Sequence, residues 1–166
     1  MGTSKPRAAA PGDPKQIFLN ADNFCEAAKM LNAVTPHNPS VIAPACAVAA
    51  LATELLLKSL ISDEGLNAVP RSHDLERLYG LIEQATKVDI EAQWGELMKL
   101  PEMAERLRQS PSHKMELGAC LTESKDAFEN YRHIYEPSRQ VAFTVGSLPH
   151  LLRNIILTMH PEWRPS

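Results

Sequence analysis

Two charged residues, Glu54 and Lys58, interrupt the most apolar segment of the chain, ACAVAALATELLLKSLI. A helix that is apolar almost all round belongs in the centre of a fold, and i,i+4 spacing lets the two side chains form a local ion pair. Because an isolated buried charge is costly, we expect this pair to meet charged residues from other helices. The competing interpretation places both residues on a narrow exposed strip.

The segment PRSHDLERLY offers one set of partners for this charged pair. His73 and Asp74 stand at the expected start of a helix, where an acidic residue is favoured by the positive end of the helix. Ser72 or His73 is the expected capping residue. As a helix start these residues need no further function, so their part in a site depends on contact with the charged pair.

A later segment, FENYRHIYE, offers a second set of partners. Arg132 and Glu136 lie four residues apart there, beside an aromatic stripe formed by Phe128, Tyr131 and Tyr135. Core packing is the competing explanation of the stripe, and a surface position is the competing explanation of Arg132. The predicted polar cluster consists of Glu54, Lys58, His73, Asp74, Arg132 and Glu136.

Apolar residues follow helical spacing through most of the chain and predict an all-α bundle of four to six helices. Asp13 as cap and Pro14 at the first helical position mark the first helix, and Gly65 suits the end of the second. We see no strand alternation, although RQVAFTV could form a short extended piece. The predicted helices are Pro14 to about Asn32, Ala43 to about Asp63, His73 to about Thr86, Ile90 to Lys99, about Lys114 to Tyr135, and Leu148 to about Met159.

We divide the chain into a flexible N-terminal tail, residues 1–13, and a single helical domain, residues 14–162. The tail is rich in Pro, Gly and Ala and lacks an apolar run, which is typical of a mobile terminus. Pro101 and Pro111 divide the region between the fourth and fifth predicted helices into short helices or loops. The residues expected to be largely buried are Leu51, Leu55, Leu56, Phe128, Tyr131, Leu152 and Ile155.

The composition bounds the classes of function. The chain has 166 residues, of which 44% are hydrophobic and 22% charged, as in ordinary globular domains. Its net charge of −3 provides no overall basic field for nucleic acid or membranes. We find no phosphate-cradling glycine loop, HExxH motif or G-x-S-x-G motif, and we expect neither a cofactor nor a metal.

Cysteine usage and hydropathy predict a cytoplasmic protein. Cys25, Cys46 and Cys120 are far apart and sit among small or apolar residues, which is typical of reduced core thiols. No secretory signal is visible. The stretch from Ala43 to Ile61 contains two charges, whereas a spanning helix needs about 20 residues nearly free of charge. We therefore expect a buried core helix and no membrane association.

Three segments together resemble the HEPN superfamily of all-α domains: ATELLLKSLI, then RSHDLERLYGLI, then AFENYRHIYE on a later helix. The resemblance spans about Ala43 to Glu136, and its Glu-x-x-x-Lys pair and His-Asp-Leu triplet are more specific together than singly. It implies a HEPN-like bundle of four to five helices that often forms a homodimer. Many members are RNA-cutting toxins or defence factors, others are non-catalytic modules, and some act with a nucleotidyltransferase partner.

The ribonuclease members of this family carry an Arg, then a polar residue and a few others, and then a His, near the start of a late helix. Four to six residues separate the Arg from the His. Two pairs in this chain approach that pattern. Arg108 and His113 flank Pro111 and precede the predicted long helix, while Arg153 and His160 are seven positions apart, nearly two helical turns. At YRHIYE, where the resemblance places the recognisable Arg, no His follows at the required distance.

An Arg/His pair of this kind suits metal-independent RNA cleavage. His can act as the base for the 2′-hydroxyl near neutral pH, and the planar fork of Arg matches phosphate oxygens. The competing interpretation of Arg153 and His160 is an exposed arginine and a histidine stabilised at a helix C-terminus.

Two classes of function follow from these observations. The first is a non-catalytic or weakly active HEPN-like module that binds a protein partner, a nucleotide or RNA, in a defence or toxin–antitoxin context. The second is a metal-independent HEPN ribonuclease that uses an Arg/His pair. The acidic balance of the chain and the loose Arg/His spacing favour the first class.

Overall fold

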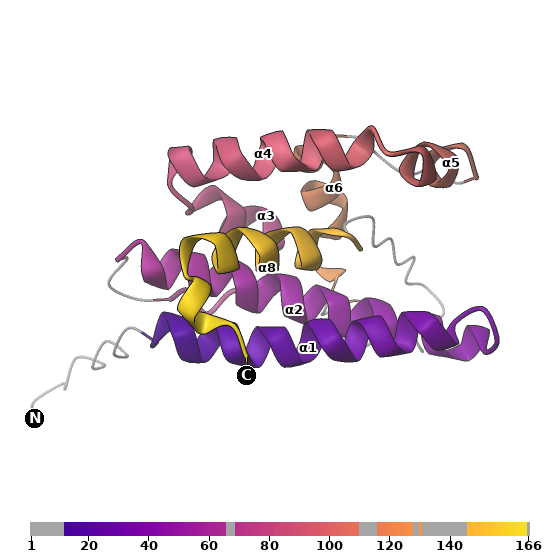
Figure 1. The fold of residues 1–166 in the computed structure, drawn as a ribbon, viewed down its shortest axis with the longest axis horizontal. Helices are drawn as coiled ribbons and strands as arrows, with labels where there is room; N and C mark the ends of the chain where they lie inside the picture. Colours follow the sequence, from indigo (N-terminus) through magenta and orange to yellow (C-terminus); the bar gives the residue numbers. More distant parts are fainter. Residues whose placement is uncertain (1–11, 66–68, 110–115, 128–129, 131–145, 166) are drawn as a thin grey trace, which may run out of the picture.

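The computed structural model describes residues 12–65, 69–109, 116–127, 130 and 146–165. This part of the chain contains no β-strand, and it holds seven α-helices and two 3₁₀ turns, Pro39–Val41 and Pro161–Trp163 (Figure 1). The all-α prediction is confirmed, while the helices already outnumber the predicted four to six. The α-helices are α1 (Pro14–Val34), α2 (Ile42–Asp63), α3 (Leu75–Gly80), α4 (Gln84–Met98), α5 (Pro101–Gln109), α6 (Leu117–Ser124) and α8 (Leu148–Met159).

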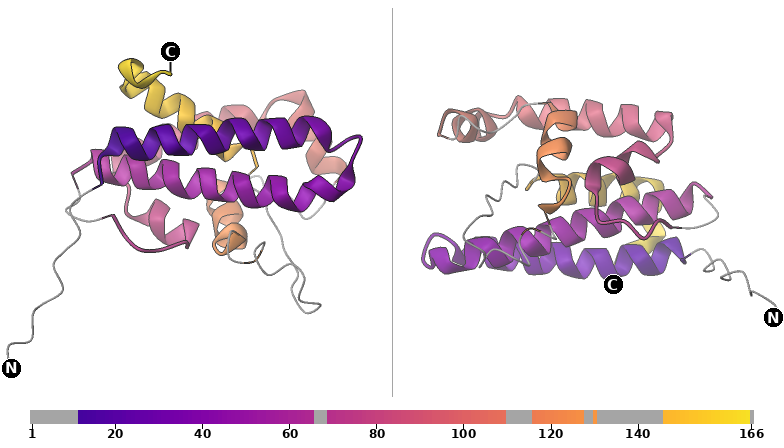
Figure 2. Two further views of the ribbon diagram at one scale, coloured as in Figure 1. Left: turned by 90° about the horizontal axis from the view of Figure 1, so that it is seen from below. Right: turned by 180° about the vertical axis from the view of Figure 1, so that it is seen from behind.

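The two longest helices, α1 and α2, form an antiparallel pair along one side of the molecule (Figures 1 and 2). The start of α1 is as predicted, because the Asp13 side chain accepts a hydrogen bond from the backbone N–H of Lys15 at 3.1 Å and Pro14 is the first helical residue. At the end of α2, Gly65 takes a φ of +81°, a left-handed conformation that favours glycine.

Helix α2 is the central helix, since it contacts α1, α3 and α8. The prediction that Leu51 and Leu55 of this helix are largely buried is wrong, because both are only half-buried. They share a partly covered strip of α2 with Val48 and Lys58, at i,i+3 and i,i+4 spacing. The predicted core residues Leu56, Leu152 and Ile155 are buried, and Phe128 and Tyr131 lie outside the described residues.

The segment Pro39–Asp63 is long and apolar enough to cross a membrane, judged by length and composition alone. Within its most apolar window, 44% of the residues are buried inside the fold. The core helix of a soluble protein meets the same criterion, so this property is weak evidence for a membrane span. The predicted absence of membrane association stays a prediction.

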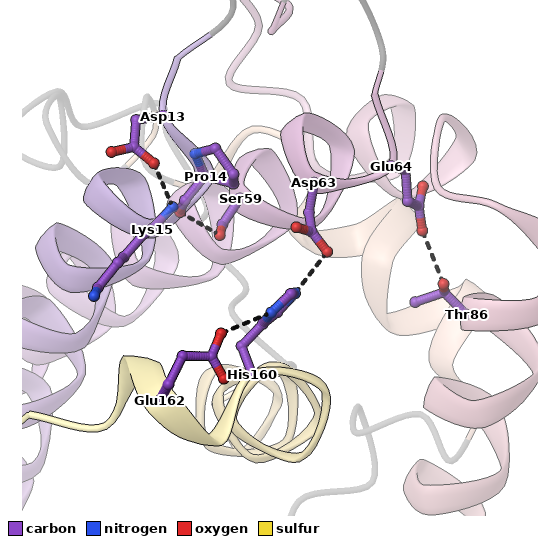
Figure 3. Close-up of polar contacts among 9 residues, drawn as sticks. All are labelled: Asp13, Pro14, Lys15, Ser59, Asp63, Glu64, Thr86, His160 and Glu162. Atoms are coloured by element: carbon purple, nitrogen blue, oxygen red, sulfur yellow. Dashed lines mark hydrogen bonds and ion pairs between the residues drawn. The ribbon is translucent and has the colours of Figure 1, made fainter.

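The prediction of one helix from His73 to Thr86 is wrong. The helix is interrupted between Gly80 and Gln84, so that this segment belongs to two helices, α3 and α4. A distant residue explains the break. Glu64, just after α2, accepts a hydrogen bond from the Glu83 backbone N–H at 2.8 Å. It also accepts one from the Thr86 hydroxyl at 2.8 Å (Figure 3). Donors at the start of a helix need such partners, so Glu64 allows a new helix to begin here.

The predicted long helix from Lys114 to Tyr135 is interrupted as well. Helix α6 ends at Ser124, and Lys125 and Asp126 form a turn. The Lys125 carbonyl accepts a hydrogen bond from the backbone N–H of Leu75 at 3.0 Å, which satisfies a donor at the start of α3. The predicted extended piece RQVAFTV lies outside the described residues.

Helix α8 lies between α4 and the α1–α2 pair (Figure 1), and it contacts all three helices. Its apolar stripe is buried as the sequence predicts, and each fully buried Leu or Ile contributes about 1.5–3 kcal/mol. These residues are Leu148, Leu151, Leu152, Ile155 and Ile156. One side of α8 is therefore fixed in the core, while another side borders α4.

Candidate functional site

Glu54 forms the centre of a polar cluster between α2 and the segment that precedes α3. Its side chain is only 3% exposed, and its two carboxylate oxygens have different partners. Lys58 Nζ lies 2.6 Å from Oε1, and His73 Nδ1 lies 2.9 Å from Oε2. The predicted contact between this charged pair and the His73 segment is therefore confirmed. Because both oxygens are engaged, the arrangement compensates the buried charge within the fold.

Asp74 does not join this cluster. Its side chain caps α3 by accepting a hydrogen bond from the backbone N–H of Arg77 at 2.9 Å. The capping residue is thus Asp74, and the prediction of Ser72 or His73 is wrong. The two adjacent residues therefore contact different elements, since His73 binds Glu54 on α2 while Asp74 caps α3. Arg132 and Glu136 lie outside the described residues.

Arg153 connects α8 to α1 through Asp22. Its Nε donates a hydrogen bond to the Asp22 carboxylate, whose side chain is 7% exposed. This hydrogen bond raises the pKa of Arg153. Burial, helped by the nearby Asp22 carboxylate, raises the pKa of the Cys25 thiol to about 12. The contact between α1 and α8 therefore holds a partly buried ion pair beside a thiol that stays protonated at neutral pH.

His160 ends α8 and bridges two carboxylates (Figure 3). Its Nε2 lies 2.8 Å from Asp63 Oδ2, and its Nδ1 lies 3.3 Å from Glu162 Oε1. The ring also stacks on Trp163, with the ring centroids 3.9 Å apart and the planes 7° apart. The imidazole thus ties the end of α8 to the end of α2.

The structure gives Arg153 and His160 different partners, and the proposed pair of Arg108 and His113 stays a prediction. Arg153 binds a carboxylate on α1, whereas His160 binds carboxylates at the end of α2 and after α8. Arg108 is exposed and pairs with Glu105 of the same helix at 2.7 Å. His113 lies outside the described residues.

An open groove of about 740 Å³ runs between α4 and α8. The sequence patterns do not predict this groove, whose volume falls within the usual range of ligand sites. A second apolar face on α4 could have indicated it, because exposed Val88 lies one turn before Ala92, and Leu100, just after the helix, is exposed as well. The lining residues are Ala92, Gln93, Glu96, Leu97, Leu100, Ser147, His150, Leu151 and Asn154.

His150 is the titratable residue on the α8 wall of this groove. Although His150 remains exposed to solvent, neighbouring groups partly desolvate its ring, and this desolvation lowers its pKa below the ordinary 6.5. Arg153 and Lys29 act in the same direction, and Glu26 opposes them. The imidazole is therefore mostly neutral at pH 7 and offers one donor and one acceptor. Together with Ser147 and Asn154 it makes this wall polar but uncharged.

Comparisons of the chain with protein-family models, curated proteins and solved structures find no match. Within the described ranges, no group of three or more His, Cys, Asp or Glu side chains is placed to hold a metal ion. The groove between α4 and α8 is the feature whose shape and lining best suit a ligand.

Proposed function

We propose that this protein is a non-catalytic, HEPN-like helical module that binds a protein partner through the α4–α8 groove. The observation that carries the proposal is the groove itself, which is open and whose lining combines four apolar residues with five polar ones, so that most of its surface is apolar. Apolar surface that stays exposed on a folded protein commonly marks an interaction site. Leu100, which lines the groove just after α4, is 41% exposed, and Val88, which is 57% exposed, extends the apolar surface along α4.

The charges of the groove favour a protein over a nucleotide or RNA. Phosphate recognition depends on Lys and Arg, and among the described residues that line the groove there is no Lys or Arg. The charged lining residue is Glu96, which would repel phosphate, and His150 is mostly neutral at pH 7. The net charge of −3 acts in the same direction.

The pairing of Arg153 supports the non-catalytic alternative. Its Nε is bound to the buried Asp22 carboxylate, so a scissile phosphate would have either to share the guanidinium with this negative charge or to displace it. A buried carboxylate without its partner is strongly unfavourable. His160 is likewise engaged through both ring nitrogens. These contacts account for both residues without a catalytic role.

The resemblance to the HEPN superfamily supplies the rest of the proposal. The all-α fold and the contact between Glu54 and His73 agree with it. This resemblance alone supports four further parts of the proposal. They are a homodimer, a cytoplasmic location, a nucleotidyltransferase or other protein partner, and a defence or toxin–antitoxin context.

Site-specific photo-crosslinking in the cells that produce the protein tests this proposal. A photoreactive amino acid replaces Gln93 on the α4 wall or Asn154 on the α8 wall, and Glu76 on α3 serves as the control position; all three are exposed. We expect protein adducts from both groove positions, either to another chain or to a second copy, and none from the control. Nucleic-acid adducts from the groove, or identical protein adducts at all three positions, would overturn the proposal.

A further inference from the structure

The dimensions of the α4–α8 groove match a short helix. One wall of the groove extends from Ala92 on α4 to Leu100, just after α4, and the other from Ser147, the residue before α8, to Asn154. At a rise of 1.5 Å per residue, each wall is about 10–12 Å long. A helix that binds in a groove uses anchors at i, i+3 or i+4, and i+7, which cover about the same length. Leu97, exposed Leu100 and Ala92 offer apolar contacts to such anchors.

The two walls of the groove differ in charge. On α4, Asp89 and Glu96 are seven residues apart, and both are exposed. Asp89 accepts a hydrogen bond from the Gln93 amide at 3.1 Å and contacts no cation among the described residues. Glu96 pairs with Lys99 at 2.5 Å. The α4 rim, defined here as Asp89, Gln93, Glu96 and Lys99, therefore carries an excess of one negative charge.

The α8 wall has no such charge. Its polar residues are Ser147, His150 and Asn154, and the two cations that act on His150 already have carboxylate partners. Arg153 binds Asp22, and Lys29 lies 3.6 Å from Glu26. An occupant of the groove thus meets an acidic rim along α4 and an uncharged wall along α8.

We infer that the occupant of the groove is an amphipathic helix of a protein partner, with an apolar stripe on the groove floor and a Lys- or Arg-bearing flank along α4. This inference rests on the proposed function and adds the chemistry of the partner. The apolar stripe follows from the leucines of the groove, and the basic flank follows from Asp89 and Glu96.

A selection from displayed helical peptides tests this chemistry. The library contains peptides of about five helical turns with a fixed leucine stripe, and each flank position is Lys, Glu or Ala. The target is the purified full-length chain. We expect Lys to be enriched on one flank, and synthetic Lys-flanked peptides to bind at least about fivefold more tightly than Glu-flanked ones at low salt. Fluorescence anisotropy measures this ratio.

Two charge-swapped variants make the test specific. In the double variant Asp89→Lys and Glu96→Lys we expect the preference to reverse towards Glu-flanked peptides. The matched control, Glu76→Lys with Glu116→Lys, makes the same change of net charge at exposed positions on α3 and before α6, and there we expect the Lys preference to remain.

The possible outcomes separate this inference from the proposed function. Binding that Ala92→Arg blocks, but that shows no flank preference, would refute the basic flank and leave the groove as a protein-binding site. Enrichment of Glu-flanked peptides by the parent would refute the basic flank in the same way. If Ala92→Arg weakens the binding of no selected peptide, both the basic flank and the proposed protein-binding groove are refuted.

Discussion

Two Glu–Lys pairs in this protein have nearly the same contact distance in opposite surroundings. Glu54 and Lys58 are 2.6 Å apart within the fold, where the Glu54 side chain is 3% exposed. Glu96 and Lys99 are 2.5 Å apart at the α4–α8 groove, where the Glu96 side chain is 75% exposed. Water screens the attraction between Glu96 and Lys99, whereas it hardly reaches the carboxylate of Glu54.

The difference shows how burial decides what a charged residue can do. The Glu54 carboxylate has both oxygens bound, to Lys58 and His73, and is closed to a ligand. Glu96 can exchange its exposed partner for a residue of another protein at little cost, because exposed ion pairs contribute about 0–1 kcal/mol. The Glu54 cluster therefore stabilises the fold, and the groove rim is available for recognition.

The largest expected effect comes from Glu54. Glu54→Ala leaves the Lys58 ammonium without its carboxylate in a nearly closed site, so we expect the free energy of unfolding to fall by about 3 kcal/mol. Glu96→Ala should change it by no more than about 0.5 kcal/mol. Urea unfolding of both variants measures the difference, and equal losses would contradict the comparison.

A smaller loss is expected at the contact between α1 and α8. Arg153→Ala leaves the buried Asp22 carboxylate without its partner, and we expect a loss of about 2 kcal/mol, because Arg153 itself is partly exposed. The double variant Asp22→Ala with Arg153→Ala should recover part of this loss, since it removes the stranded charge. If the double variant loses as much free energy of unfolding as the two single variants lose together, the pair is not coupled.

The smallest expected effect is a change in pH dependence at the groove. Because the pKa of His150 is lowered in the folded state, the unfolded chain binds its proton first as the pH falls. His150 therefore contributes stability above about pH 6.5, and this contribution is lost as the pH falls below that value.

Thermal unfolding from pH 8 to pH 5 tests the role of His150. We expect His150→Gln to retain more stability than the parent on the acid side of pH 6.5. His37→Gln, on the exposed turn after α1, controls for the loss of a histidine. Parallel pH profiles for the parent and His150→Gln would contradict the proposed environment of this residue.

The features that sequence could predict are those set by nearby residues or by a large energetic cost. Asp13, Pro14 and Gly65 mark the ends of helices through local backbone chemistry. The contact between Glu54 and His73 follows from the cost of an isolated charge in an apolar helix. Both kinds of prediction agree with the structure.

The features that sequence missed depend on residues far apart in the chain. The break before α4 depends on Glu64, whose side chain accepts hydrogen bonds from Glu83 and Thr86. The groove depends on how α4 packs beside α8, and periodicity within either helix does not specify that arrangement. Arg153 and His160 have a spacing that fits one shared site, yet their carboxylate partners come from different elements.

RNA cleavage is the most direct test of the central claim that Arg153 and His160 hold the fold and do not bind a scissile phosphate. Purified parent protein, Arg153→Ala and His160→Ala are incubated with structured and single-stranded RNA in the presence of a chelator, and their stabilities are measured alongside. We predict no substantial cleavage by the parent and a reduced free energy of unfolding for both variants. Robust cleavage by the parent that both substitutions abolish, with stability unchanged, would contradict this account and establish the ribonuclease alternative.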